Sequence, residues 1–296
     1  MEIRNLLTFV HVAELNSFTK AARALDYSQS TVSFQIKQLE TELGCLLFER
    51  LNHTLLLTDR GRELLAYAQK VCQLTEEFHQ RSVEDREVEG LIRFLSPDSL
   101  CEVMLTENYT DFYQRYPGIR LKFFTADTID MFRILDRNEA DIMMTLDSHV
   151  YHADYIIAKE RRMSSHFVAG ASSPLAGRKN LSVRDLLDVP MILTEKDMGY
   201  RKQLDTLLAK MSIEIQPVLE VGRTDLIAAI LEDGHAVSFL PDFATRKQVE
   251  AGKLVHLDVT DLKLDIWQQL IYHRNKWISR PMELFLQYIN EREFSR

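Results

Sequence analysis

Cysteine is scarce in this 296-residue chain, and its three residues, Cys45, Cys72 and Cys101, are widely separated. Because no CxxC pair is present, the sequence argues against a disulfide framework and against a cysteine-based zinc site. Long hydrophobic runs are also missing, since none reaches the roughly 20 residues that a membrane-spanning helix needs. The N-terminal MEIRNLLTFV lacks the layout of a secretory signal. We therefore expect a cytoplasmic protein with reduced thiols.

Motifs of several enzyme classes are absent as well. The chain contains no GxSxG, no Walker loop, no GxGxxG and no HExxH. Its nine histidines are dispersed, and the nearest set, His149, His152 and His166, is typical of solvated or packed side chains. An enzyme is thus the least favoured class, and we expect neither a cofactor nor a metal site.

A large positive charge, common among nucleic-acid-binding proteins, is missing too. The net charge is −8, and residues 1–62 contain seven acidic and seven basic side chains. A few well-placed cations are enough for contacts to phosphates. A neutral domain should bind weakly as a single copy, so this balance favours two or more copies acting together.

The most informative stretch runs from Ser17 to Arg62. Ser17 and Ser28 are suitable N-caps for two successive helices, and Gly44 suits the left-handed residue that ends the second. Apolar residues recur in both at three- and four-residue steps: Ala21, Ala22 and Leu25, then Val32, Ile36, Leu39 and Leu43. Two short strands, 47–48 and 55–57, follow. The pattern predicts a winged helix-turn-helix whose second helix enters the major groove of DNA.

The outward face of that second helix is rich in amides and hydroxyls, which can read the edges of bases. The candidates for base contact are Gln29, Ser30, Thr31, Ser33, Phe34 and Gln35. The candidates for backbone contact are Lys37, Arg50, His53 and Arg4. Phe34 could contact a thymine methyl group, whereas a neutral histidine at the wing tip is a weak partner for phosphate.

Residues 59–89 have the pattern of one long amphipathic helix. Its seam would consist of Leu64, Ala68, Val71, Thr75, Phe78 and Ser82, with Leu65 and Cys72 beside it. A small winged domain cannot cover so long a seam, so a second copy of the chain is the favoured partner. The alternative is packing against the regulatory part of the same chain. The predicted domains are thus residues 1–58, a linker (dimerisation) helix at 59–89, and residues 90–296.

Residues 90–296 alternate strand-like and helix-like segments, which predicts an α/β fold with a parallel sheet. Ligands bind such folds beyond the carboxyl ends of strands, near helix N-termini. This rule selects Ser99, Thr125, Asp127, Thr128, Thr194, Tyr200, Arg201, Arg223 and Thr224 as effector-binding candidates. Helix starts and arginines suit a carboxylate. Acidic residues in the same loops, namely Asp98, Asp127, Glu195 and Asp197, would favour a cation or an amino acid, and the sequence leaves both open.

A longer pattern adds to this interpretation. Residues 21–50 read A-A-x-x-L-x-x-S-Q-S-x-V-S-x-Q-I-K-x-L-E-x-x-L-G-x-x-L-F-E-R, and L-T-x-x-G follows at 57–61. This string resembles the DNA-binding domain of LysR-type transcriptional regulators. Three later segments, YPGI at 116–119, ADIMM at 140–144 and GHAVSFLP at 234–241, are similar to the regulatory domain of that family.

The resemblance implies a winged helix-turn-helix, a long linker helix and a two-lobed, periplasmic-binding-protein-like α/β regulatory domain. Lobe I would comprise residues 91–163 and 269–296, and lobe II residues 164–268. The implied function is sequence-specific transcription regulation, controlled by a small-molecule effector such as a carboxylate or amino acid bound between the lobes.

Partners implied by the resemblance are double-stranded DNA with an inverted-repeat operator and further copies of the chain, as a homodimer or homotetramer. RNA polymerase is another candidate partner, and no membrane is expected. The alternative class is a cytoplasmic solute-binding protein that carries an extra N-terminal domain.

Overall fold

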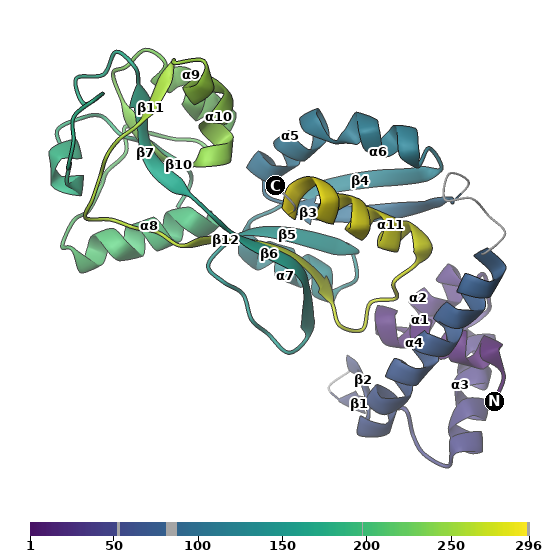
Figure 1. The fold of residues 1–296 in the computed structure, drawn as a ribbon. Helices are drawn as coiled ribbons and strands as arrows, with labels where there is room; N and C mark the ends of the chain where they lie inside the picture. Colours follow the sequence, from purple (N-terminus) through teal and green to yellow (C-terminus); the bar gives the residue numbers. More distant parts are fainter. Residues whose placement is uncertain (52–53, 81–87, 197, 295–296) are drawn as a thin grey trace.

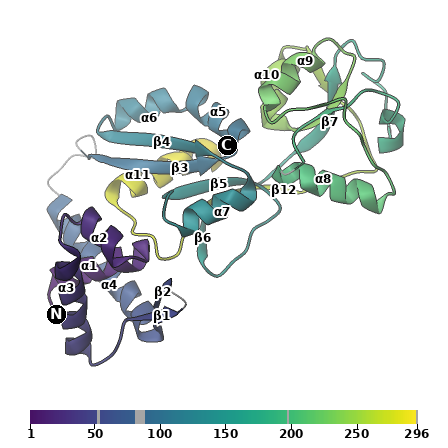
Figure 2. The same cartoon turned by 180° about the vertical axis from the view of Figure 1, so that it is seen from behind.

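The computed structural model describes residues 1–51, 54–80, 88–196 and 198–294 (Figure 1). A small N-terminal domain, a first α/β lobe and a second α/β lobe lie in a row, so that the N-terminal domain and lobe II occupy opposite ends of the molecule (Figures 1 and 2). None of the helices in the described ranges is long and apolar enough to cross a membrane.

The N-terminal domain is a helix-turn-helix with a two-stranded wing. Its elements are α1 (Ile3–Leu15), α2 (Phe18–Ala24), α3 (Gln29–Leu43), β1 (Phe48–Leu51) and β2 (Thr54–Leu57). The predicted caps are confirmed: Ser17 accepts a hydrogen bond from the backbone N–H of Lys20, and Ser28 accepts one from that of Thr31. Gly44 ends α3 with a φ of +66°, a conformation that costs glycine little.

Helix α4 (Asp59–Gln80) follows the wing and packs along α1. Its buried face differs from the predicted seam. Leu65, Ala68 and Cys72 are buried in the N-terminal core, so Ala68 belongs to the inward face. Of the other seam residues, Val71 is exposed, whereas Thr75 is half-buried and Leu64 is half-buried against the same core. The side chain of Phe78 and all of Ser82 lie outside the described residues.

Lobe I contains a five-stranded sheet in the order β4-β3-β5-β12-β6. The strands are β3 (Gly90–Ser96), β4 (Ile119–Thr125), β5 (Ile142–Asp147), β6 (Tyr155–Met163) and β12 (Ile266–His273). The helices are α5 (Asp98–Glu107), α6 (Tyr109–Arg115), α7 (Thr128–Asp136) and α11 (Arg280–Ile289), followed by a π-helical turn, η3 (Asn290–Phe294). Helix α11 covers one face of the sheet and α7 the other (Figures 1 and 2).

Lobe II is built around the sheet β10-β7-β11 and the short pair β8-β9. Its elements are β7 (Ser165–Gly170), η2 (Val183–Leu186), β8 (Ile192–Leu193), α8 (Gly199–Lys210), β9 (Leu219–Glu220), α9 (Thr224–Leu231), β10 (Val237–Pro241), α10 (Asp242–Glu250) and β11 (Leu254–His256). A buried cluster that includes Val168, Ile227 and Leu240 fixes α9 onto the sheet.

The expected parallel sheet is only partly correct. In lobe I, β3 is parallel to both β4 and β5, but β12 runs antiparallel to β5 and β6. In lobe II, β7 is antiparallel to both of its neighbours. The reason is topological, because β6 and β12 carry the chain out of lobe I and back again.

Those two strands also locate the connections between the lobes. The first connection is at Ser164, between β6 and β7. The second comes before Ile266, since Ile266 already pairs with Met163 in the lobe I sheet. Lobe I therefore resumes at Ile266 rather than at the expected residue 269.

Candidate DNA-binding and effector sites

Helix α3 presents one polar face to solvent. Its apolar residues Val32, Ile36 and Leu39 are buried in the N-terminal core, so the other side is left free. Gln29, Ser30, Thr31, Phe34 and Lys37 are exposed, and Ser33 is half-buried. Phe34 is the clearest departure from ordinary packing, because 67% of this large apolar side chain is exposed. An apolar side chain held in solvent on a polar face suits contact with a partner.

The first turn of α3 is held by a network of hydroxyl groups. Ser28 Oγ lies 2.7 Å from Ser30 Oγ and 2.8 Å from Thr31 Oγ1. Gln29 Nε2 donates to Ser33 Oγ at 3.4 Å, which keeps the amide close to the helix surface. The polar groups at the start of α3 are thus oriented before any partner arrives.

Gln35 is not available for base contact, which corrects the prediction. Its side chain is only 7% exposed, and its Oε1 accepts a hydrogen bond from Thr8 Oγ1 of α1 at 2.7 Å. The amide therefore ties α3 to α1 inside the domain. Position 35 is three residues after the buried Val32, so it shares the inward face of the helix.

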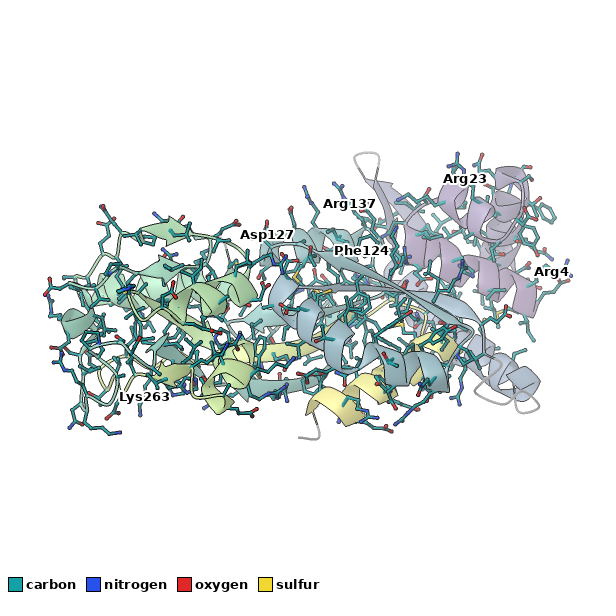
Figure 3. All side chains as sticks on the ribbon, turned by 90° about the horizontal axis from the view of Figure 1, so that it is seen from above. Arg4, Arg23, Phe124, Asp127, Arg137 and Lys263 are labelled. Atoms are coloured by element: carbon teal, nitrogen blue, oxygen red, sulfur yellow. The ribbon has the colours of Figure 1, made fainter. Side chains whose placement is uncertain are left out.

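Two of the predicted phosphate contacts can be located. Lys37 and Arg4 are exposed, on α3 and at the start of α1. Figure 3 shows Arg4 and Arg23 at the end of the molecule that is farthest from lobe II. Arg23 lies exposed in the last turn of α2 and is a basic residue that the sequence analysis did not select. The side chain of Arg50 and all of His53 lie outside the described residues.

The predicted effector loops meet at a cavity of about 300 Å³ between the lobes. Lobe I contributes the start of α5 with Ser99, the loop before α7 with Thr125, Asp127 and Thr128, and Leu146 of β5. Lobe II contributes Glu195 and the start of α8 with Tyr200. In Figure 3, Asp127 lies on the side of lobe I that faces lobe II. Five of the nine effector-binding candidates, namely Ser99, Thr125, Asp127, Thr128 and Tyr200, therefore line this cavity.

The cavity has an unusual charge pattern. Three carboxylates, those of Asp98, Asp127 and Glu195, line it, and none of the described lining residues is basic. Helices α5, α7 and α8 begin at its wall, and their N-termini carry partial positive charge. Asp127 caps α7, since its Oδ1 accepts from the backbone N–H of Asp130 at 2.8 Å. Positive helix ends and negative side chains therefore alternate around the same space.

Tyr200 brings a polar atom to this largely buried wall. The residue is 4% exposed, and burial raises the pKa of its phenol above the ordinary value. Neither Tyr200 Oη nor Thr194 Oγ1 makes a hydrogen bond of normal geometry with the described part of the chain. A ligand with a polar group could satisfy the tyrosine hydroxyl.

The remaining effector candidates lie elsewhere. Arg201 is 1% exposed and donates to the carbonyl of Thr194 and to Asp205, so it anchors α8 within lobe II rather than lining the cavity. Thr194 and Thr224 are buried outside the lining. Arg223 is exposed and pairs with Asp225, its Nε lying 2.9 Å from Oδ1. The rule based on strand ends found the right loops but could not tell which side chains turn inward.

Sequence reasoning missed Leu146, Met198 and Gly199 in the lining. Gly199 has a geometric role, because a Cβ there would overlap the carboxylate of Asp147 at the end of β5. The start of α8 can therefore approach lobe I closely. Gln203, one turn further along α8, donates to Asp147 Oδ1 at 3.0 Å. A second bridge joins the lobes where Arg246 of α10 contacts Glu107 of α5 at 2.8 Å.

The N-terminal domain is attached to lobe I through buried charges. Lys276, after β12, lies 2.9 Å from Glu14 of α1 and 2.8 Å from Asp141 of lobe I, and all three side chains are less than 10% exposed. Burial opposes ionisation of Asp141, but hydrogen bonds from Arg93 and Lys276 hold its pKa below the ordinary value. Trp277 packs on the N-terminal core, and its backbone N–H donates to Glu14.

Comparison with known proteins identifies both parts of the chain. Residues 3–62 match the family model for the bacterial regulatory helix-turn-helix protein, lysR family, and residues 85–293 match the LysR substrate binding domain. The chain is 30% identical over 292 residues to YwqM of Bacillus subtilis, an uncharacterised HTH-type transcriptional regulator, with 97% of each chain covered. It is 28% identical over 298 residues to the RuBisCO operon transcriptional regulator of Allochromatium vinosum, covering 98% of this chain and 95% of that one.

A solved structure supports the same fold. The probable transcriptional regulator PA0477 from Pseudomonas aeruginosa superposes with a TM-score of 0.59 at 17% identity, covering 98% of this chain and 97% of that chain. The two matched models together span nearly all of the sequence. The chain belongs to the LysR family, whose members are DNA-binding transcriptional regulators with an effector-binding domain and are not enzymes.

Proposed function

We propose that the regulator reads its operator with the N-terminal half of α3 in the major groove. The exposed amide and hydroxyls of Gln29, Ser30 and Thr31, with the half-buried hydroxyl of Ser33, supply donors and acceptors for base edges. Phe34 supplies an apolar contact for a thymine methyl group, and Lys37 and Arg4 supply phosphate contacts. The observation that carries this proposal is the 67% exposure of Phe34 on an otherwise polar face.

The Phe34→Ala variant tests the proposed contact between α3 and DNA. The full-length chain is first used to select binding sites from a random duplex library, and affinity for the selected site is then measured. We expect the variant to bind roughly tenfold more weakly and to lose preference at a T·A pair, because a good base contact is worth about 1–3 kcal/mol. Tyr151→Ala is the matched control, since Tyr151 is an 88% exposed aromatic residue on lobe I. Unchanged affinity and preference in Phe34→Ala would refute the proposal.

Pairing of two chains through α4 would place two such helices on one operator. Tyr67 and Val71 form an apolar stripe on the outward face of α4, at 64% and 37% exposed, and the half-buried Leu64 precedes them at the same helical spacing. Residues at these spacings share one side of a helix, as a helix-helix contact requires. The proposed assembly is a dimer that reads an inverted repeat, with two dimers forming a tetramer.

Sedimentation of Tyr67→Asp checks the assembly. A buried, unpaired carboxylate in the helix contact should shift the protein from dimers or tetramers to monomers and weaken binding to an inverted repeat more than to a half-site. Tyr151→Asp is the control for an added surface charge. If Tyr67→Asp sediments like the wild type, α4 is not the contact.

For the effector, the cavity favours a small molecule with a protonated amino group, and an amino acid fits best. The three lining carboxylates can bind the ammonium group, while the N-termini of α5, α7 and α8 can bind the carboxylate. A simple carboxylate would meet the same carboxylates without compensation. Contacts to both lobes would let the ligand change the angle between them, and with it the spacing of the DNA-binding domains.

The chemistry of the effector can be tested with matched triplets of ligands. Each amino acid is compared with the acid that lacks its amino group and with the amine that lacks its carboxylate, by thermal shift and calorimetry on the full-length chain. We expect an amino acid to bind and its deaminated partner to fail. In Glu195→Gln the affinity should fall about tenfold or more, whereas Glu214→Gln, an exposed acid of lobe II, should have no effect. Tighter binding by simple carboxylates would contradict the assignment.

A further inference from the structure

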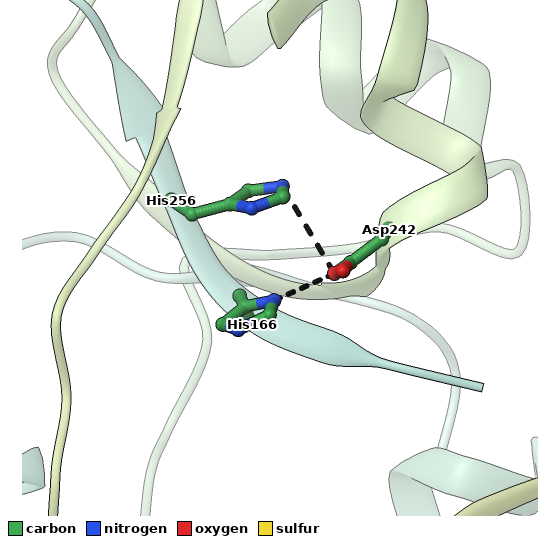
Figure 4. Close-up of side chains that lie close together, drawn as sticks. All are labelled: His166, Asp242 and His256. Atoms are coloured by element: carbon green, nitrogen blue, oxygen red, sulfur yellow. Dashed lines mark hydrogen bonds and ion pairs between the residues drawn. The ribbon is translucent and has the colours of Figure 1, made fainter. Parts of the chain in front are cut away.

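A separate cluster of metal-ligand side chains lies in lobe II, next to the first connection between the lobes. His166 is on β7, His256 is on β11, and Asp242 is the first residue of α10 (Figure 4). One ligand atom from each residue lies within 4.8 Å of the others. In the described part of the chain, no other set of three histidine, cysteine or acidic side chains comes together in this way.

The backbone of the sheet explains why these side chains meet. His256 pairs with Val168 in the β11–β7 ladder, so His166 is two residues away along β7 and lies on the same face. The two imidazole rings stack with centroids 4.7 Å apart and planes 10° apart. Asp242 follows β10, the other neighbour of β7, and its backbone N–H donates to the carbonyl of Ser164 at 3.0 Å. All three residues therefore sit on hydrogen-bonded elements that hold them in position.

The distances suit a small divalent ion after minor side-chain rotation. His166 Nδ1 lies 2.6 Å from Asp242 Oδ1, and His256 Nε2 lies 4.0 Å from the same oxygen. Ligand atoms around tetrahedral zinc, each about 2.0–2.2 Å from the metal, are separated by ~3.3 Å, a value between these two. An ion would displace the hydrogen between His166 and Asp242 and draw His256 inward. The side chains are 44%, 34% and 29% exposed for His166, Asp242 and His256, so solvent can deliver the ion.

The surroundings leave room for a further metal ligand, and the nearby arginines have acidic partners. A cavity of about 520 Å³ borders Asp242 and His256 and could hold a metal-bound water. Three arginines also line it, and each has an acidic partner: Glu107 lies 2.8 Å from Arg246, Glu293 lies 3.5 Å from Arg161, and Asp265 lies 3.8 Å from Arg162. The ligand set of two imidazoles and one carboxylate is nitrogen-rich, which favours zinc, cobalt or nickel over magnesium or calcium.

We propose that His166, Asp242 and His256 form a binding site for one divalent transition-metal ion of the zinc class, at the base of lobe II. Among the described residues, the pair of His152 and Asp154, 3.5 Å apart, belongs to no cluster with a second imidazole. The ion would tie α10 to β7 and β11. Because the same helix contacts lobe I through Arg246, the ion would also stiffen the region between the lobes.

Zinc titration of the chelator-treated, full-length protein tests the site. Calorimetry and competition with a chromophoric chelator should give one saturable site per chain, and Co²⁺ in its place should give the visible absorption of a tetrahedral complex. His256→Gln and His166→Gln should each lower zinc affinity at least tenfold. His152→Gln should bind like the wild type and serves as the matched control.

Folding of the variants is checked by far-ultraviolet circular dichroism and by metal-free thermal unfolding. His166 is 44% exposed, so His166→Gln should fold even if His256→Gln does not. Zinc should raise the unfolding temperature of the wild type and of His152→Gln but not that of His166→Gln. Absence of saturable zinc binding, or equal binding by His166→Gln and the wild type, would overturn the proposal.

Discussion

Helix α3 and the cavity between the lobes are the two functional surfaces that we propose for this regulator, and they are built in opposite ways. Helix α3 is one continuous element of 15 residues, with its own N-cap and C-cap. The cavity draws on the starts of α5, α7 and α8, in two lobes that the chain crosses twice. A surface on one helix follows from periodicity, whereas a cavity depends on how distant segments pack.

The errors of the sequence-based predictions differ between the two surfaces for this reason. On α3, five of the six predicted base-contact residues face solvent or are half-buried, and only Gln35 is tied into the core by Thr8. At the cavity, Ser99, Thr125, Asp127, Thr128 and Tyr200 do line the space, but the other candidates do not. Arg201 illustrates why: a charged residue at a helix start can anchor that helix instead of meeting a ligand.

The largest effect on stability is expected at Lys276, which connects the N-terminal domain to lobe I. Lys276→Met should destabilise the chain by about 3–5 kcal/mol, because Glu14 would lose its buried cation and Asp141 would keep only Arg93 as a charged partner. Denaturant unfolding measures the loss, and limited proteolysis should release the N-terminal domain faster. Lys263→Met, an exposed lysine of lobe II (Figure 3), is the control. Equal stability of both variants would show that the two surfaces are not coupled through this contact.

Gln35→Ala sharpens the distinction between the two faces of α3. Removing the amide leaves the hydroxyl of Thr8 buried without a partner, so the free energy of unfolding should fall by ~1–3 kcal/mol. The operator preference of the folded protein should be unchanged. Gln29→Ala should do the reverse, because its exposed amide supports no buried group. Unfolding curves and binding-site selection on both variants measure this, and a changed preference in Gln35→Ala would contradict the assignment.

A smaller effect is expected at the cap of α3. Ser28→Ala removes the acceptor for the backbone N–H of Thr31 and should cost ~1 kcal/mol of stability. DNA affinity should also fall, since the same hydroxyl positions Ser30 and Thr31. Ser33→Ala loses only a contact of 3.4 Å and should change stability by less than about 0.5 kcal/mol. Equal losses of stability in Ser28→Ala and Ser33→Ala would contradict the assignment of Ser28 as a stabilising cap.

The smallest effect concerns pH. Burial lowers the pKa of His11 below the ordinary 6.5, while Glu14 acts in the opposite direction. The unfolded chain therefore binds a proton near pH 6.5, whereas the folded chain binds it only at lower pH. The free energy of unfolding should thus fall as the pH drops below about 6.5. His11→Gln should flatten this part of the stability profile, and His235→Gln, an exposed control, should not. A profile that keeps its slope in His11→Gln would point to another group.

Helix α4 is an intermediate case between a surface on one helix and a cavity built from two lobes. Its helical spacing could be read from the sequence, and α4 is indeed a long helix over Asp59–Gln80. Which apolar residues face the core could not be predicted, because two adjacent apolar stripes run along the helix. Packing on α1 buried Leu65, Ala68 and Cys72, left Tyr67 and Val71 exposed, and left Leu64 half-buried against the same core.

By itself the sequence determined the caps at Ser17, Ser28 and Gly44, the presence of a wing, and the alternation of strands and helices in the regulatory half. These depend on local backbone and side-chain chemistry. Only the tertiary structure decided that Gln35 and Arg201 turn inward and that His166 and His256 stack beside Asp242. Such neighbours are brought together by sheet register and lobe packing, which act between residues that are far apart along the chain.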